Sequence, residues 1–118
     1  MRYLLDTDHI SFLQLGSGPE FTTLSARMAR HSSIDFALSV VGFHEQMLGG
    51  HAYINRARTT RDVIRGYEVL SQVLQSYLAA AVLPFDAAAG TAFDGLISRR
   101  VRVGTMDLRI ASIACRAV

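Results

Sequence analysis

Short apolar segments alternate along this chain with longer segments of helical periodicity. Three short segments are predicted strands: Tyr3–Leu5, Ile34–Leu38 and Val82–Leu83. The first is apolar at consecutive positions, which is typical of a strand buried in a parallel sheet. Strands that alternate with helices predict an α/β fold with a short parallel sheet flanked by helices.

Helices are predicted between and after these strands. Capping residues, glycines and a proline mark their ends. The helices run over 20–30, from Ser39 to Gly49 and Gly50, from Asp86 to Arg99, and over 107–117.

The strongest helical pattern runs from Ile54 to Ala81. Its length predicts two helices or a helical hairpin, with a break near Thr59 and Thr60. The apolar positions form one predicted stripe: Val63, Tyr67, Leu70, Leu74, Tyr77 and Ala81. Because one short sheet cannot cover this stripe, we predict a homodimer, or an assembly with another protein, that buries part of it.

The composition predicts one folded domain over residues 1–118. Half of the residues are hydrophobic and 19% are charged, which excludes a disordered chain. No apolar run approaches the roughly 20 residues of a membrane-spanning helix, and the early Asp6 argues against a signal peptide. We therefore expect a cytoplasmic protein with no membrane partner. The single cysteine, Cys115, excludes an internal disulfide and a cysteine-rich zinc module.

All 12 basic residues are arginines, and with 10 acidic residues the net charge is only +2. This charge is too small to indicate nucleic-acid binding by bulk attraction. Four arginines nevertheless fall within ten residues: Arg56, Arg58, Arg61 and Arg65. They are candidate phosphate contacts for RNA, and a solvated helix face is the simpler alternative.

Four acidic residues lie where the predicted strands end and helices begin. Asp6 follows the first strand, with Asp8 two residues later, Glu45 lies in the helix after the second strand, and Asp107 opens the last helix. Each has a local alternative, because Asp8 and Asp107 can cap helices and Glu45 can be solvated. Asp6 is the hardest to explain locally, since a buried acid needs a partner. If these carboxylates converge, their oxygen ligands predict Mg²⁺ or Mn²⁺.

Three segments that contain these acids resemble a known family. The segments Leu4–Ser11, Phe43–Gly49 and Gly104–Ala111 are similar, in order and spacing, to motifs of the PIN-domain ribonucleases. The likeness is strongest to the VapC-type toxins of bacterial toxin–antitoxin pairs. Val82–Asp86 also resembles that group, so the likeness covers nearly the whole chain.

The resemblance implies a single PIN-like domain, with three layers, that acts as an Mg²⁺- or Mn²⁺-dependent endoribonuclease. Its catalytic and metal-binding acids would be Asp6, Glu45 and Asp107, with Asp8 and Thr7 as auxiliary ligands. A metal-activated water would hydrolyse RNA phosphodiesters. The implied partners are an RNA substrate, an antitoxin protein and a second copy in a homodimer.

The chain departs from the family pattern after its last predicted helix. It ends at Val118, without the family's last strand and its further metal-site residue, which implies a truncated form. Two alternatives therefore stay open. The first is a degenerate PIN module that only binds an antitoxin or dimerises. The second is a haloacid-dehalogenase-type phosphatase, which the Asp6-Thr7-Asp8 segment resembles but which normally needs a lysine.

Overall fold

The computed structural model describes residues 3–117 and contains a small parallel sheet. The sheet order is β1-β2-β3, so that β2 lies in the middle. Tyr3 pairs with Phe36 across β1 and β2, and Leu38 pairs with Val82 across β2 and β3. The strands are β1 (Tyr3–Leu4), β2 (Phe36–Ser39) and β3 (Val82–Leu83). The predicted short parallel sheet flanked by helices is confirmed.

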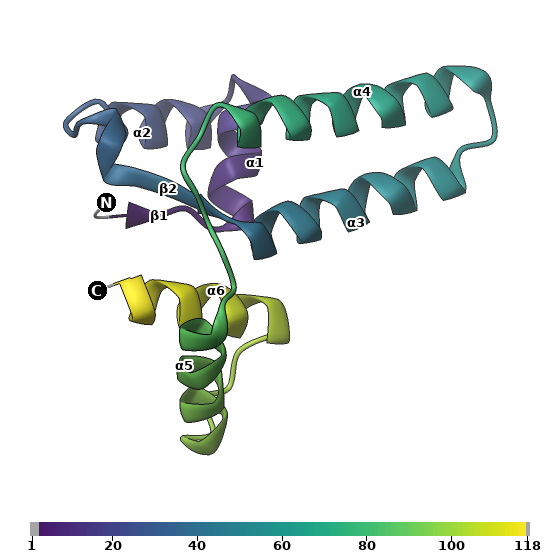
Figure 1. Ribbon diagram of the computed structural model, residues 1–118. Helices are drawn as coiled ribbons and strands as arrows, with labels where there is room; N and C mark the ends of the chain where they lie inside the picture. The colour runs from purple at the N-terminus through teal and green to yellow at the C-terminus, as the bar shows by residue number, and fades with distance from the viewer. Residues whose placement is uncertain (1–2, 118) are drawn as a thin grey trace.

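Helices make up most of the molecule (Figure 1). They are α1 (Thr7–Leu15), α2 (Pro19–Met28), α3 (Val40–Arg56), α4 (Thr60–Leu78), α5 (Ala87–Ser98) and α6 (Thr105–Ala117), with a 3₁₀ turn, η1 (Ser33–Asp35), before β2. Helix α1 is an element that the hydrophobic pattern did not predict. No helix of the described residues is long and apolar enough to cross a membrane.

Short polar side chains cap the N-terminal ends of several of these helices. The predicted caps Ser39 and Asp86 are confirmed, because their side chains accept hydrogen bonds from Gly42 N and Ala89 N. Thr59 caps α4 in the same way, which confirms the predicted break before this helix.

The prediction that the second helix ends at Gly49 and Gly50 is wrong. Helix α3 continues through both residues to Arg56. A Cβ at Gly50 would lie 2.4 Å from Leu70 Cδ2 on α4, and a Cβ at Gly66 would lie 2.4 Å from Ile54 Cγ1 on α3. The glycines at positions 50 and 66 therefore allow the two helices of the α3–α4 hairpin to approach closely, and this packing offsets the low helix propensity of glycine.

The single apolar stripe predicted along 63–81 is divided between two faces of α4. Tyr77 is buried, whereas Tyr67 and Leu74 are 57% and 51% exposed. Val73, which the prediction did not include, is buried in their place. The reason is that α3 covers only the face of α4 that carries Gly66, and the neighbouring apolar face is left uncovered.

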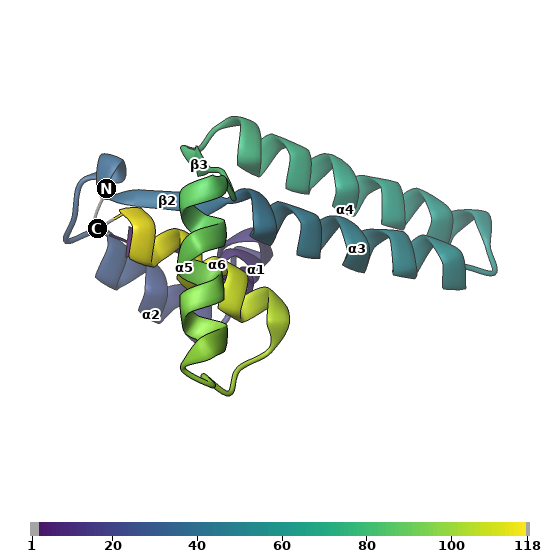
Figure 2. The ribbon, with the colours of Figure 1, turned by 60° about the horizontal axis from the view of Figure 1, so that its bottom comes forward.

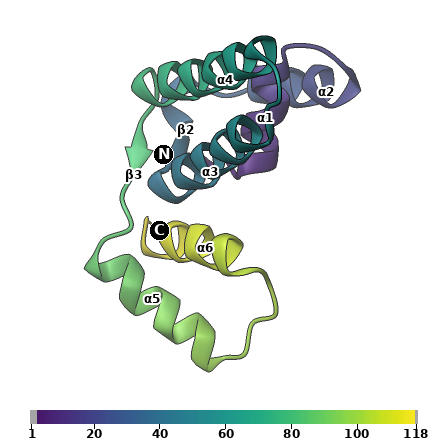
Figure 3. The same ribbon diagram turned by 90° about the vertical axis from the view of Figure 1, so that its right-hand side faces the viewer.

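Two apolar clusters lie against the sheet. Leu5 packs on the cluster of Ile10, Leu38, Val73 and Tyr77, while Leu4 packs on that of Val41, Ala89, Ile110 and Ile113. Leu5 directly follows β1 and donates its N–H to the Ala37 carbonyl of β2, so the extended chain continues through it. Successive residues of an extended chain point to opposite faces, so Leu4 and Leu5 indicate one cluster on each face. Figures 1 and 3 show α5 and α6 together on one side of the strands, with α1 and α4 on the other.

Candidate functional site

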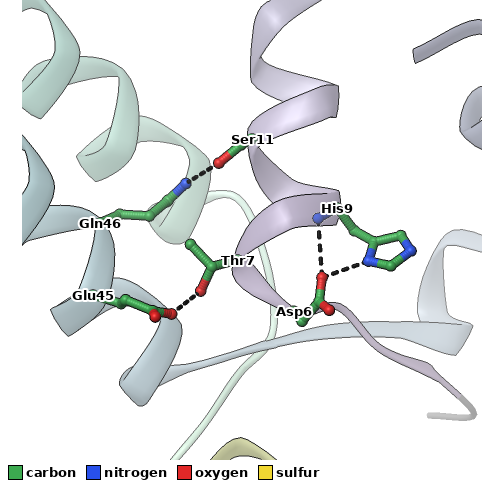
Figure 4. Close-up of polar contacts among 6 residues, drawn as sticks. All are labelled: Asp6, Thr7, His9, Ser11, Glu45 and Gln46. Atoms are coloured by element: carbon green, nitrogen blue, oxygen red, sulfur yellow. Dashed lines mark hydrogen bonds and ion pairs between the residues drawn. The ribbon is translucent and has the colours of Figure 1, made fainter. Parts of the chain in front are cut away.

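The carboxyl ends of β1 and β2 lead directly into α1 and α3. Because the two strands are parallel, these helices begin at the same edge of the sheet. The hydroxyl of Thr7 donates a hydrogen bond to Glu45 Oε1 across the gap between the helices (Figure 4). The first two acid-bearing segments predicted from the sequence are therefore in contact. The resemblance gave Thr7 only as an auxiliary ligand and did not predict this hydrogen bond.

The side chain of Asp6 contacts the first turn of α1, the helix that it precedes. Its Oδ1 accepts a hydrogen bond of 3.0 Å from the backbone N–H of His9 and pairs with the Nδ1 of the same residue (Figure 4). Partial burial acts to raise the pKa of Asp6, but the hydrogen bonds and charge of His9 outweigh it and lower the pKa. Asp6 is thus the N-cap of α1, a role that the sequence analysis gave only as an alternative for Asp8.

Tyr77 lies close to Glu45 in the core between α3 and α4. Among the residues that the structure describes, its buried hydroxyl has no hydrogen-bond partner. Burial and then the charge of Glu45 raise the pKa of Tyr77 to about 12. A Cβ at Gly42 would lie 3.0 Å from this hydroxyl, so the phenol fills the space that the glycine leaves.

The other predicted acids take no part in the hydrogen bond between Thr7 and Glu45. Asp8 and Asp107 are exposed in the first turns of α1 and α6. Within residues 3–117, no three His, Cys, Asp or Glu side chains are grouped so that they could hold a metal ion. The donor set in this arrangement does not fit a resident ion, and a site that joins Asp6, Asp8, Glu45 and Asp107 stays a prediction.

The four clustered arginines lie at the far end of the α3–α4 hairpin. Arg56 ends α3, Arg58 lies in the connection, and Arg61 and Arg65 lie in the first two turns of α4. All four are exposed. Arg56 is about 16 Å along α3 from Glu45, at 1.5 Å per residue. Their proposed contact with RNA stays a prediction.

A chain of side-chain amides ties α1, α3 and α4 together. Gln46 Nε2 donates to Gln14 Oε1 at 2.9 Å. It also donates to Ser11 Oγ at 3.5 Å (Figure 4). Gln14 Nε2 donates to Ser76 Oγ at 3.3 Å, and Gln72 Nε2 donates to the Gln14 carbonyl at 2.9 Å. These glutamines come from three segments far apart in the sequence, and no local pattern predicts their contact.

Beside this amide chain lies an open cavity of about 710 Å³, which we call the α1–α4 cleft. Gln14, Gln72 and Ser76 form its polar wall. Apolar side chains line much of the rest: Leu5, Ile10, Leu13, Met28, Ile34, Phe36, Leu38 and Ala79–Ala81. Ile34 is 76% exposed at this cleft, a large apolar side chain left in water.

By its fold, the chain belongs to the class of small α/β domains with a three-stranded parallel sheet. No protein-family model and no curated protein matches the chain.

Solved structures of the same fold are known. VapBC2 from Rickettsia felis, bound to a DNA fragment from their promoter, is similar over 99% of this chain and 82% of the matched chain, with 18% identity and a TM-score of 0.66. FitAcB from Neisseria gonorrhoeae is similar over 97% of this chain and 81% of the matched chain, with 19% identity and a TM-score of 0.66. FitAB bound to the IR36 DNA fragment is similar over 97% of this chain and 78% of the matched chain, with 18% identity and a TM-score of 0.67.

The identification with PIN-domain ribonucleases and VapC-type toxins is therefore wrong as it was made from the sequence. No family model supports it, and identities of 18–19% to chains of VapBC2 and FitAB complexes show a shared fold alone. The three motifs also have local explanations. Asp6 caps α1, Glu45 accepts from Thr7, and Asp107 lies in the first turn of α6, where the helix dipole favours an acid.

Proposed function

We propose that this chain is one component of a toxin–antitoxin pair and acts by binding its partner protein in the α1–α4 cleft. Two findings support the proposal: the fold is shared with chains of the VapBC2 and FitAB complexes, and the cleft leaves an apolar surface uncovered. The cleft is the observation that carries it. Such a pair would act in the cytoplasm.

The chemistry of the cleft suits an amphipathic segment of another protein. Its apolar lining would cover the apolar face of that segment, at about 25 cal/mol for each Å² removed from water. The polar wall of Gln14, Gln72 and Ser76 offers donors and acceptors to the backbone or polar side chains of the segment. An occupant with apolar residues on one side and polar residues on the other would satisfy both surfaces.

The walls of the cleft are held in place before a partner arrives. Gln14, on α1, is bonded to Gln46 on α3 and to Ser76 and Gln72 on α4. A cleft whose walls are already fixed loses less conformational entropy on binding. The amide chain therefore favours binding without a large rearrangement.

The proposal is tested by co-expression with the product of the reading frame next to its own gene. We expect a stable complex, with affinity measured by isothermal titration calorimetry. Ile34→Asp and Ala80→Arg should each weaken binding at least tenfold, because one places a charge in the cleft and the other fills it. Val103→Asp is the matched control, since Val103 is 52% exposed and does not line the cleft. Equal affinity for all variants would contradict the proposal.

Metal-dependent hydrolysis of RNA is a second candidate function. The observation that favours it is the Thr7–Glu45 hydrogen bond, which joins the segment that follows Asp6 to α3. The assay is run with Mg²⁺ and with Mn²⁺, the ions that carboxylate oxygens favour. We expect cleavage of a mixed RNA substrate with either ion, and its loss in Asp6→Asn and Glu45→Gln. Cleavage that persists in both variants, or that is absent from the wild type, would rule this candidate out.

A further inference from the structure

The connection between α5 and α6 carries a second cluster of arginines, and we call residues 99–103 the arginine tip. All of its arginines are exposed: Arg99, Arg100 and Arg102. No acidic residue occurs between Asp94 and Asp107 in the sequence. Within residues 3–117, neither an ion pair nor a side-chain hydrogen bond engages any of these arginines. The described part of the chain therefore leaves the charge of the tip uncompensated.

Arg100 has a strained backbone conformation. Its φ is 57°, in the left-handed region that favours glycine. Arg100 N donates to the Ile97 carbonyl at 3.0 Å, and Val101 N donates to the Leu96 carbonyl at 3.4 Å. These two bonds form a Schellman motif, which usually has glycine at the left-handed position because a side chain is crowded there. The chain thus keeps an arginine where glycine fits the backbone better.

The helix dipole does not account for Arg100. Arg99 already places a cation at the C-cap of α5, where the dipole favours one. A strained residue that the fold does not need indicates a function for its side chain. For an exposed guanidinium, that function is contact with an anionic group of another molecule.

Exposed apolar side chains lie among these arginines. Val101 and Val103, on either side of Arg102 in the sequence, are 41% and 52% exposed. A nucleic-acid backbone offers such side chains no apolar cover, whereas a protein segment does. No aromatic residue occurs between Asp94 and Asp107 that could stack on a base or anchor the tip at a lipid headgroup. The tip therefore fits a protein better than a nucleic acid or a membrane.

We propose that the arginine tip binds an acidic segment of another protein, in which carboxylates are interspersed with apolar side chains. The carboxylates pair with the guanidiniums, and the apolar side chains cover the two valines.

The place of the tip in the fold leaves it open to such a segment. Figure 2 shows the connection between α5 and α6 projecting at the lower edge of the molecule. Helices α5 and α6 lie on the opposite side of the strands from α1 and α4 (Figures 1 and 3). The acidic segment is therefore distinct from the occupant of the α1–α4 cleft, and this inference does not depend on that cleft.

Fluorescence anisotropy with labelled peptides tests the recognition of charge. The probe is a short peptide in which glutamates and leucines are separated by serines, and its counterpart has glutamine at every glutamate. We expect the acidic peptide to bind with a dissociation constant of about 100 μM, since so small a surface makes a weak interface. The glutamine peptide should bind at least tenfold more weakly, because every guanidinium loses its partner. Equal binding of the two peptides would overturn the proposal.

Two variants with the same change of charge locate the binding. Arg102→Gln should weaken binding of the acidic peptide about threefold. Arg30→Gln is the matched control, because Arg30 is exposed just after α2 and lies outside the tip; it should bind as the wild type does. An equal loss in both variants would mean attraction to the chain as a whole and would contradict binding at the tip.

Arg100→Gly separates recognition from folding. The substitution relieves the strain at this position, so the melting temperature should rise by about 2–4 °C, while the affinity for the acidic peptide falls about threefold. A lower melting temperature would show that Arg100 serves the fold. Either that result or an unchanged affinity would refute the function assigned to its side chain.

Val103→Ser and two other probes distinguish a protein segment from other anions. Val103→Ser keeps the charge of the tip and should weaken binding of the acidic peptide about twofold, because apolar contact is lost. Single-stranded RNA of mixed sequence and vesicles of phosphatidylcholine and phosphatidylserine should bind the tip more weakly than the peptide does. Tighter binding of either one that is lost in Arg102→Gln, or a Val103→Ser variant with unchanged affinity for the peptide, would overturn the proposal.

Discussion

The phenol hydroxyl of Tyr77 is buried without a hydrogen-bond partner among the described residues. Leaving such a group unpaired costs about 1–3 kcal/mol. Tyr77→Phe should therefore raise the free energy of unfolding by about 1 kcal/mol at pH 7. Urea denaturation measures this, with Tyr67→Phe as the control, because Tyr67 is 57% exposed. A clear loss of stability in Tyr77→Phe would show that the hydroxyl has a partner.

The same residue predicts a pH dependence. The pKa of Tyr77 is raised from 10.0 to about 12 in the folded chain. Between these values the unfolded chain loses the proton while the folded chain keeps it, so stability falls as the pH rises from 10 to 12. This part of the alkaline loss should be missing in Tyr77→Phe and present in Tyr67→Phe. Identical alkaline profiles for all three proteins would contradict the assignment.

Asp6 is expected to stabilise the fold through its position as the N-cap of α1. Asp6→Ala removes the cap and should lower the free energy of unfolding by about 1 kcal/mol. Asp6→Asn keeps an acceptor for His9 N and should lose less. Because the pKa of Asp6 lies below its usual 3.8, its charge stabilises the fold above that value, and the benefit is lost as the pH falls through the lowered pKa. The difference between wild type and Asp6→Asn should shrink from pH 6 to pH 3; a constant difference would contradict this.

At this scale the sequence predicted some roles and missed others. Ser39 and Asp86 were predicted as caps because capping depends on residues three positions apart. The contacts of His9, Thr7 and Tyr77 were not predicted, since these contacts form only once a helix start or a long-range packing is in place. The hydrogen bond from Thr7 to Glu45 spans 38 residues, and no local spacing indicates it.

At the scale of the elements, alanine substitutions at three glycines of the α3–α4 hairpin should change the stability differently. A Cβ at Gly66 would lie 2.4 Å from Ile54 Cγ1 and 3.2 Å from Tyr53 Cδ1, whereas nothing lies within 4 Å of a Cβ at Gly49. Gly66→Ala should lower the free energy of unfolding by about 1–2 kcal/mol, because overpacking exceeds the gain in helix propensity. Gly49→Ala should raise it by about 0.5–1 kcal/mol.

Thermal and urea unfolding of the two variants measure this difference. Gly50→Ala should lie between them, since the atom it meets, Leu70 Cδ2, ends a side chain that can move. Equal effects of Gly49→Ala and Gly66→Ala would show that the two helices do not pack closely.

The strands and most helix starts were predictable, and the extent of α3 was not. A pair of glycines is a common helix stop in sequence, but here tertiary packing needs Gly50 inside the helix. For the same reason, the periodicity of α4 could predict an apolar face and could not say which part of it α3 covers. The division of that face into a buried side at Val73 and an exposed side at Leu74 depends on the second helix.

At the scale of the whole molecule, the α1–α4 cleft is built from α1, α2, β2 and α4 together. Its lining comes from residues between Leu5 and Ala81, so it is a property of the fold and of no single motif. The acid-bearing motifs led the sequence prediction to one family because they are local and easy to recognise. The apolar lining of the cleft became visible only in three dimensions.

The most direct test of partner binding in the cleft is amide hydrogen exchange, with and without the product of the neighbouring reading frame. We expect added protection in Leu13, in residues 33–38, and in residues 72–81, which cover the end of α4 and the segment after it. The α5–α6 connection around Val103 should exchange at the same rate in both states. Protection confined to other segments, or no change anywhere at saturating partner, would contradict the proposed function.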